Sequence, residues 1–409
     1  MLKELRKEIR SNGGILMLSF LIAFYYILSQ NMAIPLNFIL LLLGLRKGIK
    51  FNTWTPIAWF GTFFLFVFLD ATFRDVEFRY VMSCFNVLVM LFTLLLYVRE
   101  HDDVDRFLKY TSVAGLFFCL YITNYYNSYF GVGRLDMELP GTRIDSAITL
   151  GYILLYFACT QLYAMFSSKN FFFTVSSYLS FIFCLYLIIL TGTRKALIIP
   201  FILLFVLLAI KYRKNIFKFT FFGVAFVLFI ILAFEFVITT EIMSEVQFLR
   251  LQGLLGFVDA NQFLDESSEE RVMLAQRAME FFLDNPVLGY GVDNTYNTLG
   301  KHAHNNYLST LCFGGIVMFL LYYWIYIKFI RRIRHFTKAD YGKLLVIVIV
   351  ALPLSDVGTT SFNVMYFNIL ISLLLIDTCK PKKRNTTLWK IRNARQPWHN
   401  VWQVHNTNQ

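Results

Sequence analysis

Charge, cysteine and long polar segments are all scarce in this sequence. Only 16% of its 409 residues are charged, 57% are hydrophobic, and the mean hydropathy is +0.57. A soluble domain of this length could not bury so much apolar surface, so lipid must solvate part of it. The six cysteines lie in or beside apolar segments without metal-ligand spacing, and we interpret them as buried hydrophobic residues rather than as disulfide partners.

Long apolar runs are abundant instead. A helix needs about 20 residues to cross about 30 Å of hydrocarbon. By this measure the sequence predicts an all-α polytopic membrane protein with about twelve transmembrane helices, all in a single membrane domain over residues 1–409. The predicted spans are 13–30, 32–45, 54–70, 80–98, 107–123, 147–166, 171–190, 195–210, 217–238, 306–327, 344–358 and 360–377.

The distribution of Lys and Arg predicts the orientation of these spans. With both termini in the cytoplasm, the inner segments hold 28 of the 38 Lys and Arg residues and the outer loops hold 10. This asymmetry follows the positive-inside rule. The net charge of +12 therefore reflects topology and contact with anionic lipid, and nucleic acid is not an expected partner. Residues 379–409 are expected to form a basic cytoplasmic tail.

One long polar insert, residues 241–305, should then lie on the extracytoplasmic side. Ser267 and Glu270 have the spacing of a capping box, with Ser267 as N-cap, and predict a helix from about Ser268 to Asp284. One face of this helix is apolar, so the helix should lie on the outer membrane surface. The residues of that face are Val272, Ala275, Met279 and Phe282.

Three side chains on the outer side are candidates for chemistry. Arg194 follows Gly192 in a short turn where the backbone could approach a phosphate, although an interfacial anchor would look the same. Arg271 could bind an anion together with the N-terminus of the loop helix, or could pair with a nearby carboxylate. His304, at the mouth of a span, could be a general base or a hydrogen-bonded interfacial histidine.

The sequence predicts neither a metal nor another cofactor. His302 and His304 alone could suggest a metal site, but no carboxylate or cysteine cluster accompanies them at ligand spacing. Asp70, Glu235 and Asp356 all fall near the predicted outer ends of spans. Ion-coupled transporters usually need ionisable groups at mid-membrane, so this pattern weakens a transporter interpretation.

Three segments carry a resemblance to a known family. They are 191–196 (TGTRKA), 269–291 (EER to DNPVLGYG) and 304–316 (HNNYL to GGI). Together they resemble the O-antigen ligase and polysaccharide polymerase family, integral membrane glycosyltransferases that use polyprenyl-diphosphate-linked sugars. The motifs cover about residues 190–320, and Lys195 departs from the family, which more often has glycine there.

The resemblance implies a GT-C-like fold and a metal-independent, inverting glycosyl transfer. Carried onto this chain, Arg194 and Arg271 would hold the donor diphosphate, and His304 would take the proton from the attacking sugar hydroxyl. Gly289 and Gly291 would let the loop fold over the lipid donor. The other residues expected to bind substrate are Arg143, which would hold the acceptor, and Lys195, Asn305 and His302.

The leading hypothesis is therefore a polymerase in the bacterial cytoplasmic membrane, with its active site on the extracytoplasmic face. It would join undecaprenyl-diphosphate-linked oligosaccharide repeat units, as donor and acceptor, into a capsule or O-antigen. One alternative is a ligase that moves a finished lipid-linked glycan to a lipid or protein acceptor. Another is a polysaccharide or lipid flippase without catalytic activity. A flippase and a chain-length regulator are the candidate protein partners of a polymerase.

Overall fold

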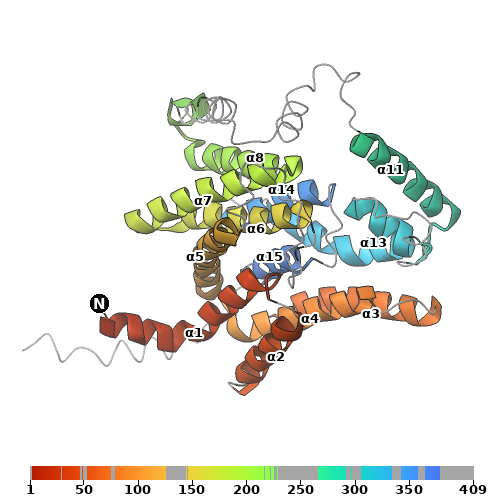
Figure 1. Ribbon diagram of the computed structural model, residues 1–409, viewed down its shortest axis with the longest axis horizontal. Coiled ribbons are helices and arrows are strands. Elements are labelled where there is room, and N and C mark those ends of the chain that lie inside the picture. The colour runs from red at the N-terminus through yellow and green to blue at the C-terminus, as the bar shows by residue number, and fades with distance from the viewer. Residues whose placement is uncertain are drawn as a thin grey trace, which may run out of the picture.

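The computed structural model contains helices as its regular secondary structure within the residues that it describes (Figure 1). These residues are 2–28, 30–46, 48, 53–74, 79–125, 144, 146–215, 217–221, 223–224, 228, 266–291, 295, 305–333, 342–357 and 364–377. The helices are α1 (Leu2–Phe24), α2 (Gln30–Arg46), α3 (Thr55–Arg74), α4 (Arg79–Tyr97), α5 (His101–Tyr125), α6 (Ala147–Ser167), α7 (Phe171–Thr191), α8 (Arg194–Tyr212), α11 (Glu266–Asp284), α13 (Asn306–Ile333), α14 (Gly342–Asp356) and α15 (Met365–Asp377).

The predicted spans coincide with these helices wherever the structure describes them. Eleven of the twelve overlap a helix, whereas 217–238 lies mostly outside the described residues. Six helices are long and apolar enough to cross a membrane, namely α3, α4, α6, α7, α8 and α13. Three shorter apolar helices lie within α1, α2 and α15. The chain is consistent with a multi-pass membrane protein, and the number of twelve spans and their orientation stay predictions.

Helices α6 and α15 form the centre of the bundle. In α6, 83% of the apolar window is buried, and every residue of α15 is buried. A helix that is apolar on all sides is stable only when other helices surround it, and α6 packs against α5, α7 and α8. In α3 and α8 only 33% of the window is buried, so their apolar outer faces are suited to lipid.

Polar side chains connect helix ends at one end of the bundle. Asp105, near the start of α5, accepts hydrogen bonds from Ser167 Oγ (2.9 Å) and Tyr163 Oη (3.2 Å) at the end of α6. The first residue of α5, His101, pairs through Nδ1 with Asp377, the last residue of α15. These contacts group the start of α5 with the ends of α6 and α15, at the end that the sequence predicts to be cytoplasmic.

The opposite end gathers the starts of α6 and α8 and the end of α14. Thr193, just before α8, donates through Oγ1 to the Ala147 carbonyl of α6 (3.2 Å). Lys195 Nζ donates to the carbonyl of Val357, which follows α14 (3.0 Å). A Cβ at Gly151 would lie 2.6 Å from Thr193 Oγ1, so the close approach of this turn to α6 requires glycine.

The predicted loop helix is confirmed as α11, with a different start. It begins at Glu266, so Ser267 lies inside the helix and the N-cap assignment was wrong. Leu274 and Ala278 of α11 are buried, and α11 packs against α13.

The apolar stripe predicted for α11 is not the face that carries the buried residues Leu274 and Ala278. Val272 and Met279 are 53% and 40% exposed, so they point away from the bundle. In Figure 1, α11 lies on the right of the molecule, with the N-terminus on the left. Contact of this stripe with the outer membrane surface stays a prediction.

Single cysteine substitutions test the orientation. Arg277 is on the exposed side of α11, and Arg213 follows α8 at the end predicted to be cytoplasmic. We expect a membrane-impermeant maleimide to label an Arg277→Cys protein in intact cells and an Arg213→Cys protein only after lysis. Both substitutions are made in a Cys379→Ser background, because Cys379 lies outside the described residues. This parent protein is the unlabelled control, since the other five cysteines, Cys84, Cys119, Cys159, Cys184 and Cys312, are buried. The reverse labelling pattern would show that the orientation in the membrane is opposite to the predicted one.

Candidate active site at one end of the bundle

Two cations from distant parts of the chain lie within electrostatic reach of each other at this end. The positive charge of Arg271, in the first half of α11, acts on Lys195 in the first turn of α8 and on the hydroxyl of Tyr152 in α6. Within the described residues, neither cation forms an ion pair with a carboxylate. Like charges repel, and a shared anion would relieve that repulsion. The site is therefore suited to a phosphate or diphosphate.

A hydrogen-bonded chain lies beside these cations. Asn306 Nδ2 donates to the hydroxyl of Tyr323 (2.7 Å), and this hydroxyl donates to Oδ2 of Asp356 (2.8 Å). Asn306 and Asp356 are buried. The negative charge of Asp356 also acts on Tyr152, the residue that Arg271 reaches. These two hydrogen bonds thus connect the first residue of α13 with the last residue of α14, next to the cation pair.

The start of α13 is held by its own side chains. Asn305 Oδ1 accepts from the backbone N–H groups of Tyr307 (3.0 Å) and Leu308 (3.2 Å), as an N-cap residue does. The ring of Tyr307 stacks on Tyr323 with centroids 5.0 Å apart, and its hydroxyl donates to the Pro353 carbonyl of α14 (3.1 Å). The Asn305 side chain therefore has a structural role, and its predicted contact with substrate stays a prediction.

Helix α13 is broken at Gly314 and Gly315, and the segment that follows α11 fits into the break. Both glycines have non-helical backbone angles. Residues 286–291 form backbone hydrogen bonds with residues on both sides of the break, so peptide groups freed by the break are satisfied. The bonds run from Tyr290 N to Cys312 O (2.9 Å), from Gly291 N to Phe313 O (2.7 Å), and from Ile316 N to Pro286 O (2.9 Å).

Glycine is required on both sides of this contact. Gly289 and Gly315 have φ values of +60° and +61°, which side chains with a Cβ rarely adopt. A Cβ at Gly289 would lie 2.6 Å from the Cys312 carbonyl oxygen, and one at Gly315 would lie 2.3 Å from the Val287 carbonyl oxygen. The motif glycine Gly289 therefore packs against α13, and its predicted role in covering the donor stays a prediction.

Arg74, at the end of α3, secures the same segment. Its Nη2 donates to the carbonyls of Gly289 (2.9 Å) and Leu288 (3.3 Å), while its Nε donates to Asp70 Oδ1 (2.7 Å). A Cβ at Gly291 would lie 2.7 Å from the Arg74 Cδ, so this second motif glycine makes room for the arginine. The segment after α11 is thus tied to both α13 and α3, and these contacts position the helix that carries Arg271.

The other predicted site residues are described only in part. Arg194 is the first residue of α8, so its backbone adjoins Lys195, but the position of its side chain lies outside what the structure describes. Arg143, His302 and His304 lie outside the described residues altogether. In the sequence, His304 directly precedes Asn305, the residue that caps α13.

Several site residues had no role assigned from the sequence. Asp356 was noted only as a charge near the outer end of a span, and Tyr323 lies inside an apolar run where tyrosine is common. The sequence did hold one signal for Asp356, namely a carboxylate isolated in an apolar segment. A buried charge needs polar partners, so such a residue indicates that other polar side chains lie nearby. Within the described part of the chain, no group of three or more His, Cys, Asp or Glu residues could hold a metal ion.

Comparison with protein families adds an independent observation. Residues 179–323 match the family model described as O-antigen ligase. This match confirms the resemblance to the O-antigen ligase and polymerase family that the sequence motifs indicated. It covers the last part of α7, all of α8 and α11, and the first part of α13, and so includes both cations and the break in α13. Ligase- or polymerase-type activity on lipid-linked glycans in a membrane is indicated by the family. No curated protein matches the chain.

A glycine-to-alanine substitution, which adds one methyl group, tests whether the contact between residues 286–291 and the break in α13 contributes to stability. We expect Gly315→Ala to destabilise the purified protein by about 1–3 kcal/mol, because alanine is strained at positive φ and its Cβ meets a carbonyl oxygen. Thermal unfolding in detergent measures the effect. Gly61→Ala in α3 is the control, since its Cβ would meet nothing within 4 Å and alanine favours helix. Equal stability of both variants would contradict the contact.

Proposed function

We propose that this protein is a polymerase that joins undecaprenyl-diphosphate-linked oligosaccharide repeat units into a bacterial surface polysaccharide. The observation that carries the proposal is the pair formed by Arg271 and Lys195, two cations from different helices within electrostatic reach of each other. Such a pair suits a diphosphate, which is the leaving group of a polyprenyl-diphosphate-linked donor. The match of residues 179–323 to the O-antigen ligase family supports this class of donor.

The cations would act on the departing diphosphate. In the transfer, the bond between the anomeric carbon and the phosphate oxygen breaks, and the diphosphate leaves with the electron pair. Arg271, together with Arg194 and Lys195, would stabilise the negative charge that develops on that oxygen. A guanidinium is well suited because its planar group binds two phosphate oxygens at once and stays charged. Donors that are already in position contribute the most to such a transition state.

His304 would be the general base of the same step. The acceptor sugar hydroxyl attacks the anomeric carbon from the face opposite the leaving diphosphate, so the new bond has inverted configuration. The hydroxyl proton would pass to an imidazole nitrogen of His304, which suits an imidazole because its pKa lies near neutral pH. His304 adjoins Asn305 in the sequence, and Asn305 caps α13 at the end of the bundle that holds the cations.

The Asn306–Tyr323–Asp356 chain would be a positioning device for this base. It joins the start of α13 to the end of α14 through two hydrogen bonds of 2.7 and 2.8 Å. Since the peptide that carries His304 enters α13 at this point, a fixed start of α13 restricts where the imidazole can lie. Preorganisation of this kind lowers the cost of reaching the reactive geometry.

A ligase is the second candidate, and the description of the matching family favours it. A ligase would bind the donor diphosphate with the same cations and would use the same general base, His304, but would transfer a finished glycan to a different acceptor. The described site does not distinguish the two reactions, because the cations contact the donor in both. The identity of the acceptor therefore distinguishes a polymerase from a ligase. Arg143 is our candidate to hold the diphosphate or sugar of that acceptor.

Purified protein with a defined lipid-linked repeat unit tests the proposal. We expect wild-type protein to produce a ladder of lengthened lipid-linked glycans. Arg271→Ala should lower the rate about 10²–10³-fold, the usual loss for one preorganised donor. His304→Ala should also lack polymer. Arg277→Ala, on the exposed side of the same helix, is the matched control and should keep the wild-type rate.

The outcomes of this experiment separate the classes. Transfer only when a second acceptor is added would identify a ligase, and no bond formation with any acceptor would end the enzymatic proposal. Near-wild-type polymer from Arg271→Ala or His304→Ala would remove that residue from the mechanism.

The proposed mechanism needs no metal, so chelation should not stop it. We expect the same reaction to proceed at an unchanged rate in excess EDTA, because the two arginines and Lys195 supply the positive charge that a divalent ion would otherwise provide. The measurement is glycan product formed with and without EDTA, with magnesium added back as control. A strict requirement for a divalent ion would return His302 and His304 to consideration as metal ligands.

A further inference from the structure

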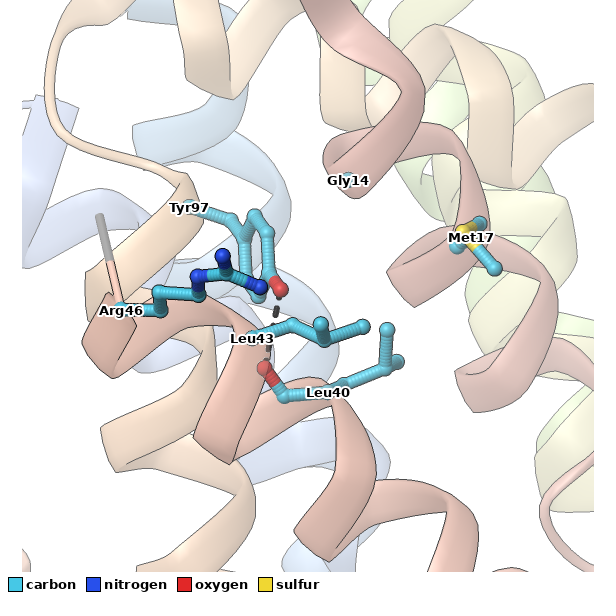
Figure 2. A pocket seen from close by; sticks show the side chains of 6 residues that line it. All are labelled: Gly14, Met17, Leu40, Leu43, Arg46 and Tyr97. Atoms are coloured by element: carbon cyan, nitrogen blue, oxygen red, sulfur yellow. Dashed lines mark hydrogen bonds between the residues drawn. The ribbon is translucent and has the colours of Figure 1, made fainter.

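A groove lies between α1, α2 and α4, at the end of the bundle opposite to the two cations. Its volume is about 430 Å³, within the range of about 300–1,000 Å³ that is typical of sites for small molecules. The wall is almost entirely apolar, with one charged residue at its edge (Figure 2). The lining residues are Gly14, Met17, Leu40, Leu43, Arg46 and Tyr97.

Tyr97 shapes this groove. It is the last residue of α4, and its hydroxyl donates to the carbonyl of Leu40 in α2 (2.8 Å). A Cβ at Gly14 would lie 2.2 Å from the tyrosine ring, and one at Gly44 would lie 2.9 Å from Leu96. The two glycines therefore let the end of α4 approach both α1 and α2. The ring forms one wall of the groove, and its hydroxyl is occupied by the backbone.

Two apolar residues of the groove are open to the surroundings, whereas Leu40 is buried. Met17 is 59% exposed and Leu43 is 46% exposed, and both lie in apolar helices. Exposure of this apolar surface to water would cost free energy, whereas contact with an acyl chain of a lipid would not. The groove is thus suited to the hydrocarbon part of a lipid rather than to a polar metabolite.

Arg46 supplies the charge at the edge of the groove. It is the last residue of α2, is exposed, and forms no ion pair with a carboxylate that the structure describes. Figure 2 shows its side chain extending beside the Tyr97 ring, above Leu43. In the sequence Arg46 begins the run Arg-Lys-Gly-Ile-Lys (46–50), which the positive-inside rule places at the cytoplasmic surface.

We propose that this groove binds an anionic glycerophospholipid of the inner leaflet. One acyl chain would lie against Met17, Leu40 and Leu43, and the headgroup phosphate would accept hydrogen bonds from the Arg46 guanidinium. The apolar wall explains the affinity for a lipid, and the single cation at the helix end explains the preference for negative charge. This site is separate from the candidate active site, and it does not depend on the proposed function.

Native mass spectrometry of delipidated protein in detergent tests the proposal. Phosphatidylglycerol and phosphatidylcholine are added in equal amounts, and the first bound lipid is counted. We expect wild-type protein to prefer phosphatidylglycerol, and Arg46→Gln to lose about fivefold of that preference, the effect of one basic side chain near an anionic headgroup. Arg46→Lys should keep most of it. Leu43→Trp, which fills the groove, should reduce the first binding event for both lipids.

Arg213→Gln is the matched control. Arg213 also ends a helix at the end predicted to be cytoplasmic, is exposed, and does not line the groove. It should keep the wild-type preference. An equal loss in Arg213→Gln and Arg46→Gln would show that the preference is a diffuse effect of surface charge and would overturn the site. So would unchanged binding in both Arg46→Gln and Leu43→Trp.

Discussion

The insertion of residues 286–291 into the break of α13 is the constraint on which the candidate site depends. Arg271 is carried by α11, a helix in a polar insert that packs against α13 and buries Leu274 and Ala278. The backbone bonds at the break and the two bonds from Arg74 Nη2 connect the end of α11 to α13 and α3. Because peptide groups freed by a helix break need partners in an apolar surrounding, the break and the inserted segment stabilise each other.

With α11 held in this way, electrostatics favours one kind of ligand. A lone interfacial arginine could simply reach the headgroups, which is the usual explanation for such a residue. Arg271 instead acts on Lys195 and on buried Tyr152, so its charge is directed into the bundle end rather than away from it. Among the described residues, the buried carboxylate whose charge also acts on Tyr152 is Asp356, and it already accepts a hydrogen bond from Tyr323. An anion is the partner that would offset two adjacent cations most directly.

The sequence predicted the helices well because each depends on a local property. Apolar length located eleven segments that overlap described helices, and Asn285-Pro286 located the end of α11. The packing of the glycines could not be predicted, since the sequence indicated only a flexible bend at Gly289. Its partner in the structure, the break at Gly315, lies 26 residues away, and no spacing rule connects the two. Asp356 was missed as a site residue for the same reason, because its contacts are tertiary.

The two ends of the bundle use arginine in different ways, and the surroundings explain the difference. Among the described residues that line the groove, Arg46 is the one with a charge, so it would offer that charge to a headgroup whose hydrocarbon supplies most of the affinity. Arg271 instead lies within electrostatic reach of a second cation, Lys195, and of buried Tyr152, an arrangement that suits the group that leaves with negative charge in the proposed reaction. A bilayer offers anionic lipid to any exposed arginine. Only an arginine placed by tertiary contacts can also select a diphosphate in a defined orientation, and the contacts of 286–291 supply that placement here.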